Sequence, residues 1–287
     1  MPRLPSLKEE LEEVKLKYSA LREEWGLQQE HLGRLQSQIS GLHNQLQQQS
    51  AFCASLGAIF GHLLWKASRS SEIVDSITSG NRIGDFFLMV VGTLTSFMDT
   101  YKTELPSQNS DESQFVMALV GIITNIAAAA GGRNFLIVDE QGKNVVRHFV
   151  KILQNIPVPS GNCLKRLIFM SLYNVSINSV GVVYLQDQPN LITGIAKTLE
   201  DDTQPQELHL MALRLLQSLT WEINCTATLN NIVDTVSKRC LEKFAWSANS
   251  EFKAAATAII NNIDRNKLKL ENLKDCGGKY VECDQLY

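Results

Sequence analysis

The chain has 287 residues, of which 44% are hydrophobic and 20% are charged, and its formal net charge is −3. This composition is typical of a folded globular protein and excludes a largely disordered one. It also gives no case for nucleic-acid binding by the chain as a whole, because duplex-binding proteins concentrate basic residues on one face.

A heptad repeat runs without a slip through residues 4–63, and all but two of its a and d positions are apolar. Such a repeat predicts that residues 1–50 form a coiled coil that assembles a homo-oligomer. The bulky a-position residues Tyr18 and Trp25 fit poorly in a tight two-stranded core, which favours three or four strands. Between a dimer and a tetramer the sequence does not decide. The predicted oligomerisation residues are Leu11, Tyr18, Leu21, Trp25, Leu32, Leu35, Ile39, Leu42 and Leu46.

Beyond residue 50 the composition turns apolar, and Gly57 and Gly61 are expected to interrupt the long helix. Every segment of residues 51–265 has helical periodicity, with turn-forming residues between the segments. Residues 266–287 have mixed charge and no helical period, so we expect them to form a disordered tail.

An internal repeat emerges when residues 124–136 are aligned with residues 173–185. Both carry the pattern asparagine, aliphatic, small, four variable residues, glycine, two variable residues, aromatic, leucine. Asn125 is aligned with Asn174, and Ser218 and Asn262 take the asparagine position further on, at intervals of 44 to 49 residues. These intervals lie within the range of armadillo-type repeats. The sequence therefore predicts an all-α protein, with an N-terminal coiled-coil helix followed by an armadillo-like solenoid.

Asn174 and Asn178 lie in an uncharged run, residues 167–185, that predicts one helix, and their spacing of four places them on one face of it. The last helix of each repeat in a solenoid lines a shared concave surface. Asparagine offers both a donor and an acceptor, which suits pairing with the backbone of an extended peptide. Alternatively, these amides bond to neighbouring loops or cap helix ends between repeats. We favour peptide binding because the polar residue returns with each repeat.

The distribution of basic residues also favours peptide binding at the concave surface. No acidic residue occurs between Glu140 and Asp187, whereas Lys143, Arg147, Lys151, Lys165 and Arg166 all fall there. We therefore hypothesise that the concave face is positive and prefers acidic or backbone-presenting peptides. The predicted peptide-binding residues are Asn125, Arg133, Lys165, Arg166, Asn174, Asn178 and Ser218.

Motifs for catalysis or cofactor binding are missing from the sequence. The five histidines show no metal-ligand spacing, and the glycines form neither a phosphate loop nor a dinucleotide fingerprint. No serine or cysteine lies in a nucleophile elbow. We therefore expect a non-enzymatic protein without a cofactor or a metal ion.

Two uncharged runs, residues 113–132 and 167–186, are long enough to raise the question of membrane spans. Each contains asparagine and glycine at mid-depth, so buried helices explain them better. The main rival to peptide binding is a helical-repeat protein that contacts nucleic acid directly through its basic region, residues 143–166.

Residues 110–137 (SDESQFVMALVGIITNIAAAAGGRNFLI) and 170–178 (MSLYNVSIN) closely resemble the heat shock factor 2-binding protein family, and residues 56–68 and 208–219 resemble it more loosely. The resemblance implies an oligomerising coiled coil and an armadillo domain that binds a repeated, disordered segment of the breast cancer type 2 susceptibility protein. It further implies a nuclear role on meiotic chromosomes in homologous recombination, where the family helps bring recombinases to double-strand breaks. An additional location in the cytoplasm stays open.

The resemblance also implies roles for single residues and for further partners. Asn174 and Asn178 match the family's peptide contacts, and Arg133 matches a position associated with function. Heat shock factor 2 is an implied partner, as is a meiotic break-repair protein that binds the family's extreme N-terminal helix. This chain is expected to begin part-way through that N-terminal region, so the presence of the second site stays open.

Overall fold

The computed structural model describes residues 3–275, with the side chains of residues 7–272. Every regular element within this range is an α-helix and none is a strand, which confirms the all-α class. The helices are α1 (Arg3–Ala67), α2 (Ser71–Thr78), α3 (Ile83–Thr100), α4 (Asp111–Ala128), α5 (Ala130–Val138), α6 (Glu140–Leu153), α7 (Asn162–Val175), α8 (Ser179–Gln186), α9 (Leu191–Glu200), α10 (Gln206–Trp221), α11 (Thr226–Thr235), α12 (Lys238–Ala245) and α13 (Ser250–Asp275).

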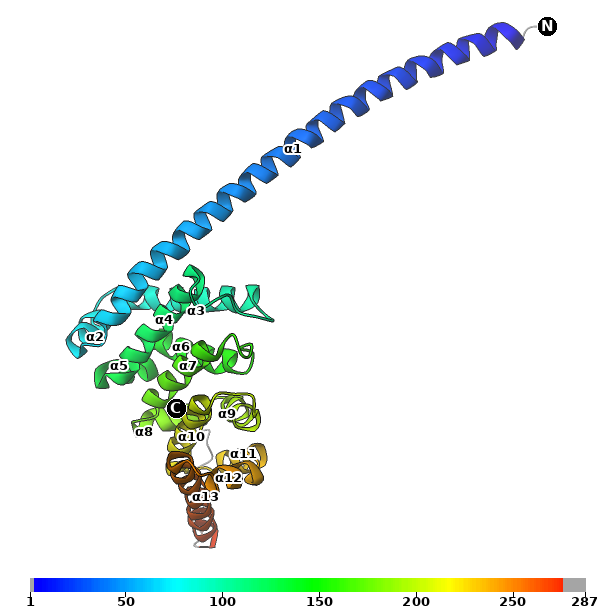
Figure 1. Ribbon diagram of the computed structural model, residues 1–287. Coiled ribbons are helices and arrows are strands. Elements are labelled where there is room, and N and C mark those ends of the chain that lie inside the picture. The colour runs from blue at the N-terminus through cyan, green and yellow to red at the C-terminus, as the bar shows by residue number, and fades with distance from the viewer. Residues whose placement is uncertain (1–2, 276–287) are drawn as a thin grey trace. The chain divides into compact units, whose positions relative to one another are not determined.

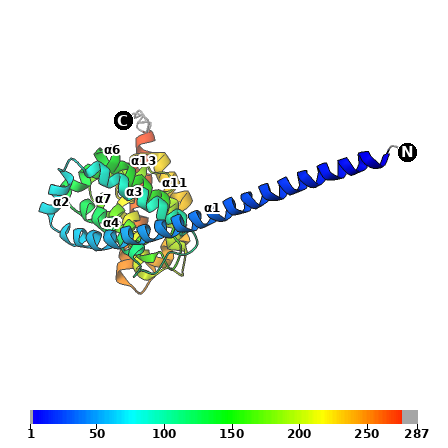
Figure 2. The ribbon, with the colours of Figure 1, turned by 90° about the horizontal axis from the view of Figure 1, so that it is seen from above.

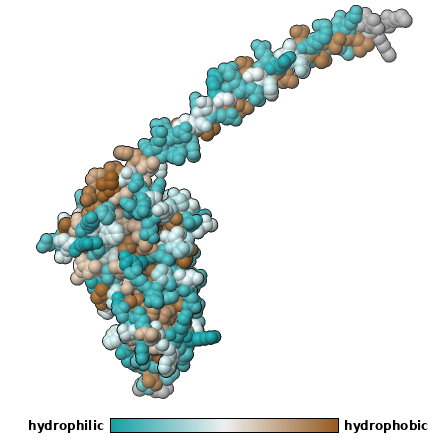
Figure 3. All heavy atoms as spheres, viewed as in Figure 1, coloured by the Kyte–Doolittle hydropathy of each residue, from teal (hydrophilic) through white to brown (hydrophobic). Residues whose placement is uncertain are grey.

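The chain divides into two compact units, residues 1–54 and residues 55–287. The described part of the first unit is a single helix, the N-terminal part of α1. All nine predicted oligomerisation residues are exposed on it, from 40% for Leu35 to 66% for Leu42 and Leu46. Figure 3 shows such hydrophobic side chains along α1 among hydrophilic ones. A helix that exposes a row of large apolar residues is stabilised when partner helices cover them. The coiled coil stays a prediction, and this exposed apolar surface supports it.

The second unit begins inside α1, which runs unbroken through residue 67. The prediction that Gly57 and Gly61 interrupt this helix is therefore wrong. Both glycines face α4: a Cβ on Gly57 would lie 2.8 Å from the ring of Phe115, and a Cβ on Gly61 would lie 3.0 Å from the Cβ of Ala118. The close packing that glycine permits offsets the roughly 1 kcal/mol of helix propensity that each one costs.

Helices α2 to α13 form four successive triplets, which Figure 1 shows stacked in chain order and Figure 2 shows from above. The third helices of the triplets (α4, α7, α10 and α13) pack against one another in sequence, and we call them the third-helix row. The second helices α3, α6 and α9 pack in the same order. One continuous apolar core extends from Val74 in α2 to Leu270 in α13. Triplets that contact mainly their neighbours and share a continuous core define a helical solenoid.

The glycine in the matched sequence pattern makes the sharp turn from one triplet into the next. A Cβ on Gly132 would lie 2.4 Å from the carbonyl oxygen of Ile126, and a Cβ on Gly181 would lie 1.9 Å from that of Val175. Both carbonyls belong to the residue after the matched asparagine. Only a residue without a side chain allows this approach, and the chain bends by 105° between α4 and α5.

The C-terminal helix α13 continues through Asp275, well into the segment predicted to be a disordered tail. Asn266 is 2% exposed and Leu270 is 8% exposed. The Asn266 side chain donates to the Thr220 carbonyl at 2.9 Å and accepts from the Ile223 amide at 3.2 Å. The first residues of that segment therefore belong to the solenoid, and residues 276–287 lie outside the described part of the chain.

Among the described residues, α3 is long and apolar enough to cross a membrane by length and composition alone. Within this helix 22% of the residues are buried, namely Phe87, Val90, Leu94 and Phe97, which face the solenoid core. The uncharged run at 113–132 forms no single span, because it covers the corner between α4 and α5.

Candidate peptide-binding groove

The matched asparagines and Ser218 connect each member of the third-helix row to the previous member of the row, and α4, the first member, to α1. The Asn174 Nδ2 donates to the carbonyl oxygen of Thr124 at 3.1 Å, and the Ser218 Oγ donates to that of Ser176 at 3.0 Å. The outer positions do the same: Asn125 Nδ2 donates to the Trp65 carbonyl at 3.0 Å, and Asn262 Nδ2 donates to the Gln217 carbonyl at 3.4 Å. A structural bond to the neighbouring repeat, or to α1 in the case of Asn125, is thus present at every matched position, which is the alternative role weighed from the sequence.

These bonds leave part of the side chains free for a ligand. Asn174 uses one amide hydrogen, and its Oδ1 and second hydrogen have no partner among the described residues. Asn125 uses its Nδ2 twice, on Trp65 and on the Ser68 hydroxyl at 2.9 Å, which leaves its Oδ1. Both side chains are partly exposed. The free oxygens are acceptors, and the backbone N–H groups of an extended peptide are suitable donors.

Asn174 and Asn178 do not share one helix face, because the predicted helix over residues 167–185 is two helices. α7 ends at Val175, and Asn178 is the N-cap of α8. The Asn178 Oδ1 accepts from the Gly181 amide at 2.7 Å, which satisfies one of the free N–H groups at the start of α8. Sequence reasoning missed this break because the capping asparagine and the corner glycine lie within an apolar run.

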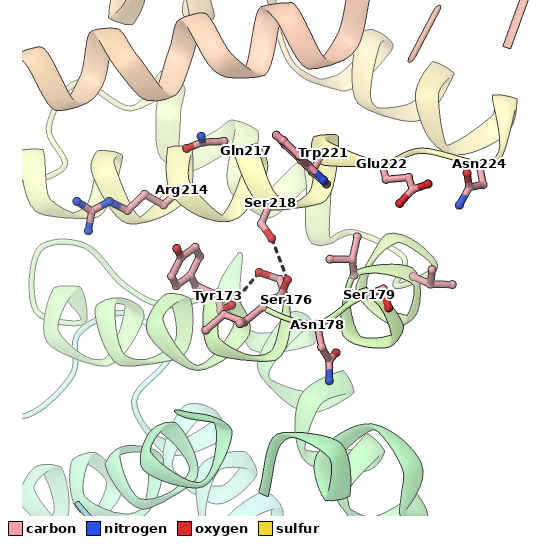
Figure 4. Close-up of a pocket in the computed structure, with 13 residues that line it drawn as sticks. Tyr173, Ser176, Asn178, Ser179, Arg214, Gln217, Ser218, Trp221, Glu222 and Asn224 are labelled. Carbon is pink, nitrogen blue, oxygen red and sulfur yellow. Dashed lines mark hydrogen bonds between the residues drawn. The ribbon is translucent and has the colours of Figure 1, made fainter. Parts of the chain in front are cut away.

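A groove of about 560 Å³ opens between the end of α7, α8 and the end of α10 (Figure 4). Two of the predicted peptide-binding residues line it, Asn178 and Ser218. The other lining residues are Tyr173, Ser176, Ile177, Ser179, Val182, Val183, Arg214, Gln217, Trp221, Glu222 and Asn224. Asn174 does not line the groove itself, although its neighbour Tyr173 does.

Trp221 is the largest side chain of the groove and is 64% exposed. The Arg265 guanidinium of α13 lies 4.8 Å from the centre of its ring and also donates to the Trp221 carbonyl. Ile177, 55% exposed, and Val183, 41% exposed, supply further apolar surface. Trp221 follows Ser218 by three residues, as Ile177 follows Asn174. The same offset gives Ala128 and Arg265 at the other two matched positions, so the repeat alone did not identify Trp221.

Arg133, another predicted contact, caps the C-terminal end of α4. Its Nε donates to the Ala127 carbonyl at 3.1 Å, and its Nη2 donates to the Ala128 carbonyl at 2.9 Å. A cation at a helix C-terminus is favourable because the last carbonyls lack partners within the helix. Arg133 does not line the groove and lies one repeat closer to the N-terminus than the groove does.

Lys165 is 6% exposed, so it contributes no positive charge to an accessible surface. Burial lowers the pKa of its ammonium group, and the nearby Asp201 carboxylate opposes that shift. It also lies nine residues before Asn174 on α7, about 13 Å along the helix axis. The structure therefore does not bring Lys165 together with the asparagines.

The basic run does not form one patch. Lys143, Arg147 and Lys151 belong to α6, whereas Lys165 and Arg166 belong to α7. Two of these charges are already paired across short distances: Arg147 with Glu140 at 2.5 Å, and Arg166 with Glu207 at 2.6 Å. Arg147 is the main cause of the lowered pKa of the Glu140 carboxyl. A concentrated positive face, which the nucleic-acid alternative requires, is therefore not found in this region.

The chemistry of the groove suits binding. Its polar groups are hydroxyls, amides, one guanidinium and one carboxylate, set beside a tryptophan, a tyrosine and aliphatic side chains. Such a mixture of apolar surface and a few convergent polar groups is typical of ligand sites. In the described part of the chain, no group of three His, Cys, Asp or Glu residues could hold a metal ion.

The fold and the groove define an armadillo-type helical solenoid. A crystal structure of computationally designed armadillo repeat proteins for modular peptide recognition superposes with a TM-score of 0.50. That likeness has 16% sequence identity and covers 67% of this chain and 69% of the designed one, so it shows the fold.

A family model, the ARM-like domain of heat shock factor 2-binding protein, matches residues 54–180 and 189–267. The mouse heat shock factor 2-binding protein is 33% identical over 230 residues, which are 80% of this chain and 67% of the mouse protein. The chain therefore belongs to the heat shock factor 2-binding protein family, as the resemblance of residues 110–137 and 170–178 predicts.

Proposed function

We propose that this protein is a non-enzymatic scaffold of meiotic homologous recombination. Its armadillo domain binds a disordered, repeated segment of the breast cancer type 2 susceptibility protein and helps bring recombinases to double-strand breaks. Heat shock factor 2 is a further proposed partner, in keeping with the name of the mouse relative. The proposed location is the nucleus, on meiotic chromosomes. Membership of the family and the groove beside the third-helix row support this proposal.

The groove is the main observation behind the proposal, because it places polar side chains that can bond to a peptide backbone beside apolar side chains that can hold peptide side chains. Asn178 and Ser218 lie on its walls, and the free Oδ1 of Asn174 lies on the same helix as the lining residue Tyr173. Exposed Trp221 offers a flat apolar face of the kind that anchors peptide side chains. Lys165, which is buried, is not proposed as a contact.

Self-association through α1 would multiply weak binding. The exposed seam of residues 1–50 supports a homo-oligomer, either a dimer or a tetramer. A repeated ligand segment could then occupy several grooves of one assembly, and linked sites raise the effective concentration of each further contact to about the millimolar range.

The test is a fluorescence anisotropy titration of the full chain with overlapping synthetic peptides from the disordered region of the breast cancer type 2 susceptibility protein. We expect one peptide to bind in a saturable manner, and Trp221→Ala to weaken that binding about tenfold or more. Trp246→Ala is the matched control, because Trp246 is 88% exposed at the end of α12 and does not line the groove. If no peptide binds, or if both variants bind as tightly as the wild type, the proposed function is wrong.

A further inference from the structure

We propose that, without a partner, the groove is occupied by the chain's own C-terminal segment, residues 279–287 (KYVECDQLY), which then competes with partner peptides. This inference rests on the proposed function, because it assigns a competitor to the same groove. The segment lies outside the described residues, and four features of the described part and of the sequence support it: the position of α13, the length of chain beyond it, the sequence of that chain and the charges beside the groove.

The helix that leads to the segment runs along the edge of the groove. The Arg265 side chain covers Trp221, and the Lys269 Nζ donates to the Asn224 Oδ1 at 3.2 Å. Trp221 and Asn224 both line the groove. α13 ends six residues after Lys269, about 9 Å further along its axis. The part of α13 that leads toward the segment therefore lies beside one end of the groove.

The chain beyond α13 is long enough to turn back and follow the groove. From Trp221 to Arg214 the lining residues span seven positions of α10, about 10 Å along the axis. Residues 276–287 are twelve in number, and an extended chain covers about 3.3–3.6 Å per residue. Their reach of about 40 Å exceeds the return path of about 20 Å. In the sequence, Gly277 and Gly278 follow two and three residues after Asp275, and glycine is the residue that most readily adopts the conformations with which a chain reverses direction.

The segment has the side chains that the groove accepts. Tyr280 and Val281 are adjacent in it, and Leu286 and Tyr287 follow. In an extended chain successive side chains point to opposite sides, so one member of each pair can face the apolar wall while the backbone meets the polar groups. The wall offers Trp221, Ile177 and Val183 to such side chains.

Charge favours the same occupant. Of the basic residues beside the groove, Arg214 pairs with Glu251 at 2.8 Å, and Lys269 pairs with Glu222 at 3.6 Å. Arg265 has no carboxylate partner among the described residues, and its guanidinium lies over one face of the Trp221 ring. The segment supplies Glu282 and Asp284 against one lysine, so its excess carboxylate complements this guanidinium.

A tethered competitor weakens the binding of any free peptide by a predictable factor. A short tether holds its segment at an effective concentration on the order of 1 mM. If the free segment binds with a Kd of about 100 µM, the tethered copy weakens a competing peptide about tenfold. A partner that presents several copies of its segment to an oligomer would overcome this competition more readily than a single copy.

The experiment compares the full chain with a full-length variant that carries Tyr280→Asp and Val281→Asp. The probe is a labelled peptide of residues 279–287 with Cys283→Ser, followed by fluorescence anisotropy. We expect the double variant to bind the probe about tenfold more tightly than the wild type, because its own segment no longer competes. Adding Trp221→Ala to the double variant should abolish this gain, and adding Trp246→Ala should preserve it.

Two results would overturn the proposal: equal probe affinity of the wild type and the double variant, or no saturable binding to the double variant up to about 1 mM probe. A variant chain that ends at residue 275 gives a second measurement, with its helicity and melting temperature compared with those of the full chain. The same chains titrated with the partner peptide separate the two proposals. Equal partner affinity in the wild type and the double variant refutes the competitor alone, whereas no partner binding to either refutes the proposed function.

Discussion

Replacing Asn178 with aspartate is expected to preserve the fold while weakening peptide binding. The carboxylate keeps an oxygen that can accept from the Gly181 amide, now bonded at 2.7 Å. A negative charge at a helix N-terminus is favourable by roughly 0.3–1 kcal/mol. The substitution removes the amide Nδ2, which has no partner among the described residues and is the only donor of this side chain. Loss of such a donor to a peptide carbonyl, with repulsion added, should weaken binding about tenfold.

Replacing Asn178 with alanine removes the cap as well as the donor. Loss of a capping side chain costs about 0.5–2 kcal/mol, and α8 has only 8 residues over which to recover that cost. For a domain of this size, 1 kcal/mol corresponds to a fall in Tm of about 2–4 °C. We therefore expect Asn178→Ala to melt a few degrees below the wild type, and Asn178→Asp to melt at or slightly above it.

Differential scanning calorimetry and anisotropy titration with the partner peptide measure the two roles on the same samples. An aspartate variant that melts with the alanine variant would refute the reasoning from the cap. An aspartate variant that binds the peptide as tightly as the wild type would show that Asn178 is a cap and makes no ligand contact through its amide.

Three further predictions follow from the described contacts. Gly181→Ala should destabilise the solenoid by about 1–3 kcal/mol in chemical denaturation, because the new Cβ would lie 1.9 Å from the Val175 carbonyl oxygen. Gly92→Ala is the control and should not destabilise it, because the space around the new Cβ is open. Leu32→Asp combined with Leu35→Asp should lower the mass measured by sedimentation equilibrium without changing the melting temperature of the solenoid. An unchanged mass would contradict the prediction that residues 1–50 form an oligomerising coiled coil. Burial lowers the pKa of His148 in the folded state, and the charge of Lys151 adds to this shift. The unfolded state therefore binds the proton more tightly than the folded state does. The stability of the fold should fall as the pH drops below about 6.5. His148→Gln should flatten this dependence in thermal melts, and an unchanged slope would show that His148 is not its source.

The repeat pattern predicted the solenoid because its residues are those that a repeat corner demands. Gly132 and Gly181 match since a Cβ at either position would strike the carbonyl after the matched asparagine. Asn125 and Asn174 match because each donates a hydrogen bond to a carbonyl near the C-terminal end of the helix it packs on, which is α1 for Asn125 and α4 for Asn174. The periodicity of the asparagine, which favoured peptide binding in the sequence, therefore also has a structural cause.

Other features depend on contacts between segments far apart in the chain. The burial of Lys165 arises from packing of α7 between its neighbours, and no local pattern separates it from the partly exposed Arg166 one position later. The sequence predicts that Gly57 and Gly61 break the helix, because their close packing against Phe115 and Ala118 is not evident from the local sequence. The groove itself is built from three helices, and Trp221 becomes prominent only when α8 and α10 stand side by side.

Hydrogen–deuterium exchange of the full chain, with and without the partner peptide, tests the groove most directly. The account predicts that the peptide slows exchange of backbone amides in residues 173–183 and 214–224, which hold the lining residues. It predicts no comparable change in α6, where Lys143, Arg147 and Lys151 lie. Protection confined to α6, or binding without protection at the groove, would contradict the central claim.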